Sequence, residues 1–392
     1  MTSQVEVAGV GMHPFGRFPN SSLKDLARVA VARALADAGL GIGDIQAVYS
    51  ANAMAGLLQG QEQIRGQATL RDVGIERVPV VNVENACASG SSAFREACIA
   101  VRAGVAETVL AVGFEKMFVD DRDKSLAALE SAADLDVVGG LGLQFTAVYA
   151  LRLRKRLDDG SLTLSDLAKS AVKSHRNGSL NPNAQHRKPV TEEEVLASRP
   201  IAEPLTLLMC SSIADGAAAV VVSKPGLHPV GDRSRITVRA SAAGSGFTTT
   251  GAPETANSTL VAERAYAEAG IGPGDISLAE VHDAMAPGEL LYYEHLGFCE
   301  PGGAADLLRS GSTQIEGRIP VNTSGGLSSR GHPVGATGLG QLCEVAWQLR
   351  GEAGARQVRR PRFGLAQNSG GWLEGESAAT NVHILERLSA WD

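Results

Sequence analysis

Several familiar functional patterns are absent from this chain. Aromatic residues make up only 4% of its 392 residues, and no apolar run reaches the roughly 18 residues of a membrane-spanning helix. The net charge is −7, and no basic run of the kind that binds nucleic acid occurs. We therefore expect no membrane span and no nucleic-acid partner.

The cysteines give no metal or disulfide signature. The chain has five, an odd number at wide spacings, and no CxxC motif: Cys87, Cys98, Cys210, Cys299 and Cys343. This pattern argues against structural zinc and predicts reduced thiols, and we expect no metal site.

The first residues, MTSQVEVAGVGMHPFG, lack the basic start and apolar core of a signal peptide. We accordingly expect a cytoplasmic protein.

Two common catalytic motifs are also missing. No GxSxG elbow is present, which disfavours a serine hydrolase. No P-loop occurs, and the glycine-rich GVGMHPFG near the N-terminus does not fit GxGxxG. Any chemistry must therefore come from another arrangement of side chains.

An internal repeat is the first positive signal. Residues 34–45 read ALADAGLGIGDI, and residues 265–276 read AYAEAGIGPGDI, with eight of twelve positions identical. The second copy begins 231 residues after the first, far beyond the repeat length of about 20–50 found in solenoids. The pattern indicates a duplicated domain.

Other segments follow in the same order in both copies. Each half is predicted to contain a helix, a strand, a turn, a second helix and a further strand, which indicates a layered α/β fold with pseudo-twofold symmetry. We predict an N-terminal half at 1–117 plus 208–228, a polar loop or lid insertion at 118–207, and a C-terminal half at 229–392. Within the insertion, helices are expected at 142–157 and 164–175.

Cys87 lies in VNVENACASGSSAF, where a strand-like run meets a series of small residues. At the start of a helix, free backbone N–H groups lower the pKa of a thiol and favour the thiolate, and small neighbours leave room for an acyl group. A buried cysteine in a tightly packed small-residue helix fits the segment equally well. The segment alone does not separate the two interpretations.

Three other segments contain candidate catalytic residues. His332 lies in the glycine-rich loop GGLSSRGHPVGATG, and His282 lies at a strand end in EVHDAM. Either could instead be structural: a surface histidine in a turn, or a histidine paired with a neighbouring carboxylate. Gly370 lies in the turn-forming GLAQNSGG, whose backbone N–H groups could face an oxyanion. A cysteine and a histidine at equivalent sites of two halves can meet as a nucleophilic pair.

These segments resemble the thiolase superfamily over nearly the whole chain. The likeness is carried by the Cys87 segment, GFEKM, CSSIADGAAA, EVHDAM, SGGLSSRGHPVGATG and QLRGEAGARQV. HDAM resembles the HDCF motif of the sterol-carrier-protein-x-type branch. The resemblance implies a five-layered αβαβα fold, a homodimer, a role in lipid metabolism, and a coenzyme A thioester as substrate with no tightly bound cofactor.

The resemblance also implies roles for individual residues. Cys87 would be the acyl-thioester nucleophile. His332 would activate it and help hold a thioester oxyanion, and His282 would position a water there. The backbone N–H groups of Cys87 and Gly370 would form a second oxyanion hole. The insertion would bind coenzyme A, and a short segment would lie along its pantetheine: Ala243, Gly244 and Ser245.

The chain departs from the family at the second catalytic cysteine. Ordinary thiolases carry it in a C-terminal CxG motif, where this chain has Asn368-Ser369-Gly370, and the sterol-carrier branch carries it in HDCF, where this chain has Ala284. That cysteine moves the proton at the α-carbon, a task worth about 10²–10⁴-fold in rate. Three explanations are open: another group moves the proton (Asp283, His282, or Tyr292 and Tyr293), the acceptor needs no such base, or activity is reduced.

Three functions remain open from the sequence. The first is an acyl-CoA C-acyltransferase that forms or cleaves a carbon–carbon bond of a 3-ketoacyl-CoA through a Cys87 thioester. The second is a retro-aldol lyase of steroid-type side-chain CoA esters that acts with a small zinc-ribbon/OB-fold partner protein. The third is a non-catalytic acyl-CoA binder. Retention of Cys87 and His332 favours the first.

Overall fold

The computed structural model describes residues 4–142, 144–229, 231, 233–247, 255–373 and 375–388. The strands are β1 (Glu6–Gly16), β2 (Ala47–Ala51), β3 (Val80–Val83), β4 (Thr108–Glu115), β5 (Pro200–Ala202), β6 (Leu205–Thr206), β7 (Asp215–Ser223), β8 (Arg235–Ser245), β9 (Leu278–Glu280), β10 (Phe363–Gly370) and β11 (Ala379–Leu388). The helices are α1 (Leu23–Ala38), α2 (Ala55–Gln59), α3 (Arg65–Leu70), α4 (Ser89–Arg102), α5 (Arg122–Glu130), α6 (Leu135–Val138), α7 (Phe145–Asp158), α8 (Leu164–Ser179), α9 (Glu192–Ala197), α10 (Asn257–Ala269), α11 (Gly288–His295), α12 (Ala304–Arg309), α13 (Gly326–Arg330) and α14 (Thr337–Arg350).

The helix α1 shows how the sequence forms these elements. Ser22 and Asp25 make a reciprocal capping box at its start, and Gly39 ends it in the left-handed conformation at φ 68°. Leu26 and Ala30, four residues apart, lie on the face that is buried against the sheet. No helix in the described ranges is long and apolar enough to cross a membrane.

The strands run in the order β3-β2-β4-β7-β1-β8-β11-β10-β9, and this order shows the duplication. The first five strands belong to the N-terminal half and the last four to the C-terminal half. Within the halves, β2 pairs parallel with β4 as β9 does with β10, and β4 pairs antiparallel with β7 as β10 does with β11. The halves meet where β1 and β8 pair at Glu6 and Thr237. The predicted pseudo-symmetry is confirmed.

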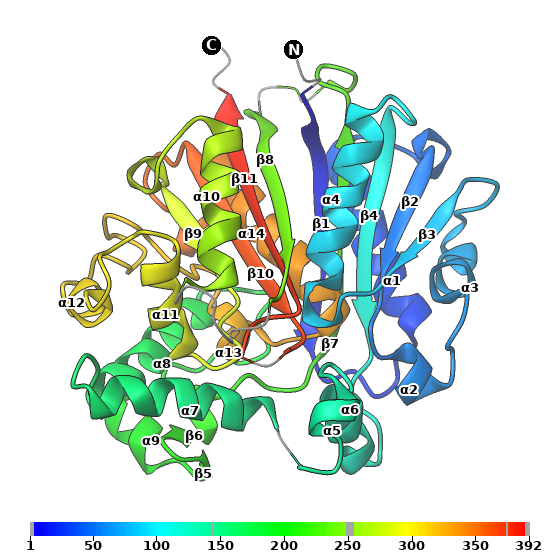
Figure 1. Cartoon of the computed structure of the whole chain (residues 1–392). Helices are drawn as coiled ribbons and strands as arrows, with labels where there is room; N and C mark the ends of the chain where they lie inside the picture. Colours follow the sequence, from blue (N-terminus) through cyan, green and yellow to red (C-terminus); the bar gives the residue numbers. More distant parts are fainter. Residues whose placement is uncertain are drawn as a thin grey trace.

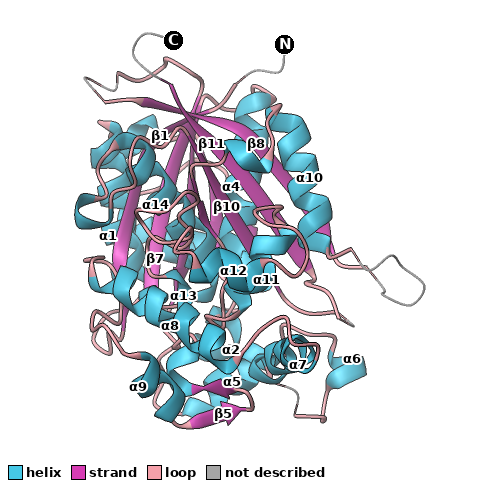
Figure 2. Ribbon diagram, turned by 90° about the vertical axis from the view of Figure 1, so that its left-hand side faces the viewer, coloured by secondary structure: helices cyan, strands magenta, loops and turns pink. Residues whose placement is uncertain are grey.

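The layers follow from which helices cover which strands (Figures 1 and 2). The helix α1 packs on β1, β4 and β7, and α10 packs on β8 and β11. Between the two halves, α4 and α14 contact each other and strands of both halves, so they form the central layer. Burial of their apolar residues, such as Phe94 and Leu339, stabilises the fold by about 1.5–3 kcal/mol for each large side chain. The predicted five-layered αβαβα fold is confirmed.

The insertion lies at one end of the sheet and carries α5 to α9 with the small hairpin β5–β6 (Figure 1). Its two predicted helices are present as α7 and α8. The helix α8 is buried to a greater extent than its polar sequence indicates, because its polar groups find buried partners. Lys173 Nζ lies 2.6 Å from Glu289 Oε1 and donates to the carbonyl oxygen of Val321 at 2.6 Å. The limits of the three predicted regions stay a prediction.

Candidate active site

Cys87 lies in the turn that joins β3 to α4. A short 3-10 helix, Ala86–Ala88, precedes α4, and Ala86 has a left-handed φ of 48°. The Ser89 hydroxyl donates to the carbonyl oxygen of Ala86 at 2.6 Å and accepts from the backbone N–H of Asn85 at 2.9 Å. These bonds hold the turn in one conformation, and the half-buried Cys87 side chain leaves it at a fixed angle.

The small residues around Cys87 allow the opposite half of the molecule to approach. A β-carbon at Gly90 would lie 2.8 Å from the carbonyl oxygen of Gly335, and one at Gly113 would lie 2.2 Å from the same atom. Gly335 belongs to the loop that carries His332. The small residues therefore serve the packing of the two halves at the same place where Cys87 meets the His332 loop. A tightly packed cysteine and a nucleophilic cysteine, the two interpretations of this segment, do not exclude each other.

Glu115 anchors that loop from the other half. Its Oε2 accepts from the backbone N–H of Gly335 at 2.9 Å, and its Oε1 accepts from the Asn52 amide at 2.8 Å and from the Met54 N–H at 3.0 Å. Burial raises the pKa of Glu115 to about 7, against the lowering effect of these backbone bonds. One carboxylate at the end of β4 thus connects the His332 loop to the loop that follows β2.

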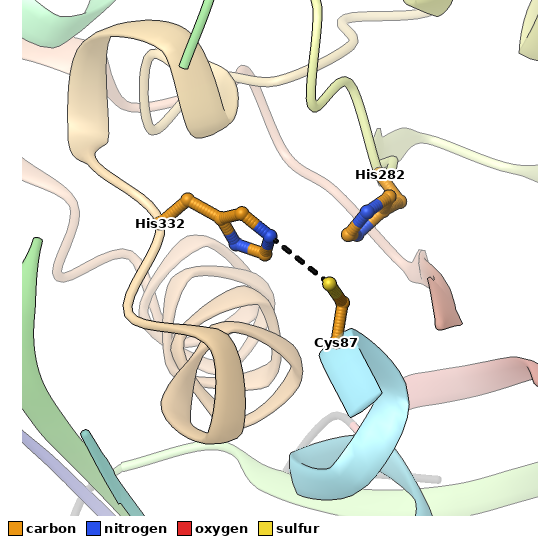
Figure 3. Close-up of side chains that lie close together, drawn as sticks. All are labelled: Cys87, His282 and His332. Carbon is orange, nitrogen blue, oxygen red and sulfur yellow. Dashed lines mark hydrogen bonds between the residues drawn. The ribbon is translucent and has the colours of Figure 1, made fainter. Parts of the chain in front are cut away.

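His332 faces Cys87 directly: its Nε2 lies 3.3 Å from the Cys87 Sγ (Figure 3). Its Nδ1 lies 2.7 Å from the Thr337 Oγ1, and the Thr337 hydroxyl donates its single proton to the carbonyl oxygen of Pro333 at 3.0 Å. The hydroxyl must therefore accept from His332 Nδ1–H. This places the imidazole lone pair on Nε2, where it can take the proton of the thiol.

Both members of this pair are neutral. Burial raises the pKa of the Cys87 thiol to about 12, and Glu115 adds to the rise, while the N–H groups of Cys87 and Gly371 act against it. Burial also holds the pKa of His332 well below its usual value, and His282 and Arg330 lower it further. The prediction that the helix start lowers the Cys87 pKa is wrong, because burial outweighs the backbone N–H groups.

His282 completes the cluster from the end of β9. Its ring packs edge-on against that of His332, with 5.2 Å between centroids (Figure 3). Its backbone N–H donates to Gln367 Oε1 at 3.0 Å, and its Nδ1 lies 2.9 Å from the side-chain amide of Asn368. Burial, followed by the charge of Arg330, lowers the pKa of His282 to about 3. Asn368, at the family's second-cysteine position, therefore contacts this histidine.

Cys87, His282 and His332 bring one sulfur and two nitrogen atoms within 4.8 Å of one another. Such a set of donors could hold a thiophilic ion such as Zn²⁺. Across the described part of the chain, no other cysteine belongs to this group. The expectation of a metal-free protein stays a prediction.

Gly370 lies beside the cluster, at the end of β10. A β-carbon at Gly370 would lie 2.2 Å from the carbonyl oxygen of Asn85, so glycine allows β10 to pack closely on the Cys87 turn. The backbone N–H groups of Cys87 and Gly371 are the ones that act to lower the pKa of the Cys87 thiol. Whether Gly370 N–H binds an oxyanion stays a prediction.

The predicted pantetheine segment forms the end of β8. Ala243 pairs with Asn381 of β11, and Asn381 donates to the Ser92 hydroxyl of α4 at 3.2 Å. Exposure increases along the segment, from half-buried Ala243 and Gly244 to exposed Ser245. The segment is therefore connected to the Cys87 helix at one end and open to solvent at the other.

Two of the suggested replacements for the second cysteine are engaged elsewhere. Asp283 Oδ1 accepts from the backbone N–H of Leu327 at 2.8 Å, and burial raises its pKa well above the usual value. Tyr293 bonds Glu289 and lies 3.0 Å from the Thr313 hydroxyl. Neither side chain belongs to the Cys87 cluster.

Sequence reasoning missed three residues of the site. Thr337 and Glu115 lie inside the motifs GHPVGATG and GFEKM, but no pattern separates them from their neighbours. Tyr149, on α7 of the insertion, packs on the backbone of Gly288 and interacts electrostatically with Tyr292 and Cys87. The scarcity of tyrosine in the chain is the one signal that could have drawn attention to it.

The sequence of this chain is similar to those of known proteins. The family model "Thiolase, N-terminal domain" matches residues 5–225, and "Thiolase C-terminal domain-like" matches residues 243–387. The chain is 40% identical to the acetyl-CoA acetyltransferase of Methanothermobacter thermautotrophicus, over 98% of this chain and 99% of that protein. It is 34% identical to sterol carrier protein 2 of Homo sapiens, over 94% of this chain and 70% of that protein.

Two solved structures are also similar to this chain over nearly its whole length. A structure described as "Ltp2-ChsH2(DUF35) aldolase" matches 98% of both chains with a TM-score of 0.78 and 26% identity. Human mitochondrial 3-ketoacyl-CoA thiolase in complex with CoA matches 99% of both chains with a TM-score of 0.74. At 16% identity, this second likeness shows the fold alone.

Proposed function

Because this chain belongs to the thiolase family and is an acyltransferase, we propose that it forms or cleaves a carbon–carbon bond of a 3-ketoacyl-CoA through a thioester on Cys87. The observation that carries the proposal is the 3.3 Å contact between Cys87 Sγ and His332 Nε2, with Thr337 fixing the tautomer. The relatives named acetyl-CoA acetyltransferase support an acetyl group as one acyl group that the site transfers.

The geometry supports general-base activation of a neutral thiol. His332 Nε2 takes the thiol proton as the sulfur attacks the acyl carbonyl, and the imidazolium then passes that proton to the departing CoA thiolate. Thr337 accepts from Nδ1–H throughout, which stabilises the imidazolium. In this proposal the backbone N–H groups near Cys87, including that of Gly370 or Gly371, bind the oxyanion.

Coenzyme A is the carrier of the substrate in this proposal. Its pantetheine runs along Ala243, Gly244 and Ser245, toward the solvent-exposed end of β8. In this proposal the insertion covers the acyl group, and its Tyr149 interacts electrostatically with Cys87.

An exchange experiment tests the proposal. With acetyl-CoA and isotopically labelled free CoA, the unaltered protein should move label into acetyl-CoA without a second acyl acceptor. Cys87→Ala and His332→Ala should lose this exchange, His332→Ala by about 10²–10⁴-fold. Binding of CoA without any exchange would instead support a non-catalytic acyl-CoA binder.

A retro-aldol lyase is the second candidate, and two observations favour it. The chain is 26% identical to the structure described as "Ltp2-ChsH2(DUF35) aldolase" over 98% of both chains, and its second-cysteine positions hold Asn368 and Ala284. Such a lyase would cleave a 3-hydroxyacyl-CoA to an aldehyde or ketone without free CoA, together with a small zinc-ribbon/OB-fold partner. Cleavage that survives Cys87→Ala would favour this function over the first.

We also propose that two copies of the chain form a homodimer in the cytoplasm. The strand β3 is an edge strand of the large sheet, and Val81 on it is 47% exposed. The opposite edge strand, β9, is covered by a bridge between Ala279 and Val321. An uncovered apolar edge of this kind is commonly paired with another chain.

A further inference from the structure

A buried lysine joins the insertion to the C-terminal half of the molecule. Lys173 lies on α8, which packs on α13 (Figure 2), and its side chain is fully buried. Its Nζ lies 2.6 Å from the Glu289 Oε1 and donates to the carbonyl oxygen of Val321 at 2.6 Å. Lysine and glutamate are rarely buried to this extent, and a buried ion pair by itself is weak evidence for stability. The pair must therefore be judged by what it holds in place.

Two further side chains continue this contact toward His282. The Glu289 Oε2 accepts from the Asn322 side-chain amide at 2.8 Å, and the Asn322 Oδ1 accepts from the backbone N–H of Val281 at 2.8 Å. The orientation of the amide is fixed, because one end meets an N–H donor and the other a carboxylate. A buried hydrogen-bonded chain therefore runs from Lys173 of the insertion to the residue before His282.

The same helix also holds the backbone of Asn322. Its φ is 54°, in the left-handed region that residues other than glycine seldom adopt, although asparagine tolerates it better than most. Lys173 binds the preceding carbonyl oxygen, and the Asn177 side-chain amide of α8 donates to the carbonyl oxygen of Asn322 at 3.0 Å. Uncommon backbone conformations persist where their surroundings fix them, and they concentrate at functional sites.

Sheet pairing ends before His282. The strand β9 has only three residues, and its pairing with β10 ends at Glu280. The next two N–H groups bond to side chains: that of Val281 to the Asn322 Oδ1, and that of His282 to the Gln367 Oε1 at 3.0 Å. The backbone that carries His282 thus depends on side-chain acceptors, one of which belongs to the chain from α8.

We propose that Lys173 is a positioning residue for His282. It fixes Glu289 and Asn322, and through them the backbone that carries the histidine into the Cys87 cluster. The inference rests on the proposed function, because it takes that cluster to carry out the reaction. The insertion then contributes to catalysis through a buried contact, in addition to covering the acyl group.

Thiolysis of acetoacetyl-CoA by free CoA tests the proposal. Lys173→Met removes the cation, and kcat should fall by about 10–100-fold with little change in KM, because a small misplacement of a catalytic group affects the reaction more than substrate binding. Lys169→Met is the matched control, since Lys169 lies one turn earlier on α8 and is exposed, and kcat should stay unchanged.

A second variant covers the case in which the first does not fold. Lys173→Met leaves a buried carboxylate without its cation, and circular dichroism shows whether the chain still folds. If it does not, Lys173→Met combined with Glu289→Gln replaces the ion pair by neutral groups of similar size and should fold. The new glutamine has no cation to fix it, so kcat should still fall by about tenfold or more.

A spectroscopic measurement separates positioning from a general loss of structure. In protein labelled with ¹³C in its eight histidine rings, the NMR signal of His282 is identified by its disappearance in His282→Gln. The folded Lys173 variant should shift or broaden this signal. It should leave the signal of His228 unchanged, because that ring lies 2.8 Å from the Thr108 hydroxyl in the N-terminal half. Lys169→Met should leave both signals unchanged.

The two measurements must agree. A His282 signal that stays unchanged in the folded Lys173 variant overturns the inference, even if kcat falls. A kcat equal to that of Lys169→Met overturns it as well, even if the signal shifts. Absence of both CoA exchange and thiolysis in the unaltered protein contradicts the proposed function instead, and the histidine signals then still test the link between Lys173 and His282.

Discussion

Thr337 decides which nitrogen of His332 faces the Cys87 sulfur. Its hydroxyl is committed to the carbonyl oxygen of Pro333 and can only accept from Nδ1–H. A single hydroxyl five residues after the histidine thereby directs the imidazole lone pair at the Cys87 sulfur. The pKa directions agree with this arrangement, since burial keeps both Cys87 and His332 neutral at rest.

Removal of the Thr337 hydroxyl should therefore slow acylation of Cys87. Thr337→Val keeps the shape of the side chain but leaves Nδ1–H without its acceptor, so the tautomer with Nε2 protonated becomes accessible. We expect acylation by acetyl-CoA to slow by about tenfold or more, as measured by rapid quench and intact mass. Thr337→Ser, which keeps the hydroxyl, is the matched control, and equal rates in the two variants would contradict the assignment.

The pH dependence of Cys87 alkylation tests its protonation state. Burial raises the pKa to about 12, so the thiolate fraction should increase about tenfold for each pH unit across the range from 7 to 9. An ordinary thiol, with a pKa of about 8.5, would begin to level off there. The measurement is the rate of iodoacetamide modification mapped to the Cys87 peptide. A rate independent of pH over this range would indicate a thiolate–imidazolium pair instead.

At the scale of elements, close approach between the halves forms the site. The turn before α4 and the loop before α14 meet because Gly90 and Gly113 leave space for the carbonyl oxygen of Gly335, and Glu115 of β4 holds the loop through the N–H of Gly335. The repeated order of helix, strand, turn and helix in the sequence predicted that these two turns could meet. The distance between them depends on packing around glycines, which no sequence pattern specifies.

Substitution Gly113→Ala should disturb the fold and the site together. The new β-carbon would lie 2.2 Å from the Gly335 carbonyl oxygen, so the His332 loop must move. We expect a loss of about 1–3 kcal/mol in the free energy of unfolding, measured by denaturant titration, and slower acylation of Cys87. Gly43→Ala, at a position with no atom within 4 Å of the added carbon, is the control and should change neither quantity. An unaltered Gly113→Ala protein would contradict this packing argument.

The end of β8 offers a test of the coenzyme A path. Ser245 is exposed at the end of the strand, so Ser245→Trp should fold normally but obstruct pantetheine. We expect KM for acetyl-CoA to rise about tenfold with little change in kcat, because the substitution removes binding without touching the reacting atoms. Steady-state kinetics measure this, and an unchanged KM would place the pantetheine elsewhere.

At the scale of the whole molecule, the sequence predicted more of the fold than of the chemistry. The duplicated segments, the layers and the meeting of Cys87 with His332 follow from the order of elements along the chain. The raised pKa of Cys87 and the burial of α8 with Lys173 could not be predicted, because both depend on how much water the assembled layers exclude. The contact of Tyr149 with the site depends on how the insertion folds back onto α11.

The edge strand β3 tests the proposed homodimer. Val81→Lys places a charge on the uncovered edge and should shift the protein toward monomer, as measured by analytical ultracentrifugation over a range of concentrations. Val105→Lys is the matched control, since Val105 is 77% exposed but lies in the turn after α4 rather than on the edge. A dimer equally stable in both variants would show that β3 is not the contact surface.

The central claim is that Cys87 carries the acyl group and that His332 transfers its proton. The most direct measurement is rapid mixing with acetyl-CoA, acid quench, and mass analysis of the intact chain and its peptides. An acetyl adduct should form on the Cys87 peptide within one turnover, disappear on addition of free CoA, and form much more slowly in His332→Ala. An acetyl group found on another residue, or turnover of a 3-ketoacyl-CoA with no adduct at Cys87, would contradict the account.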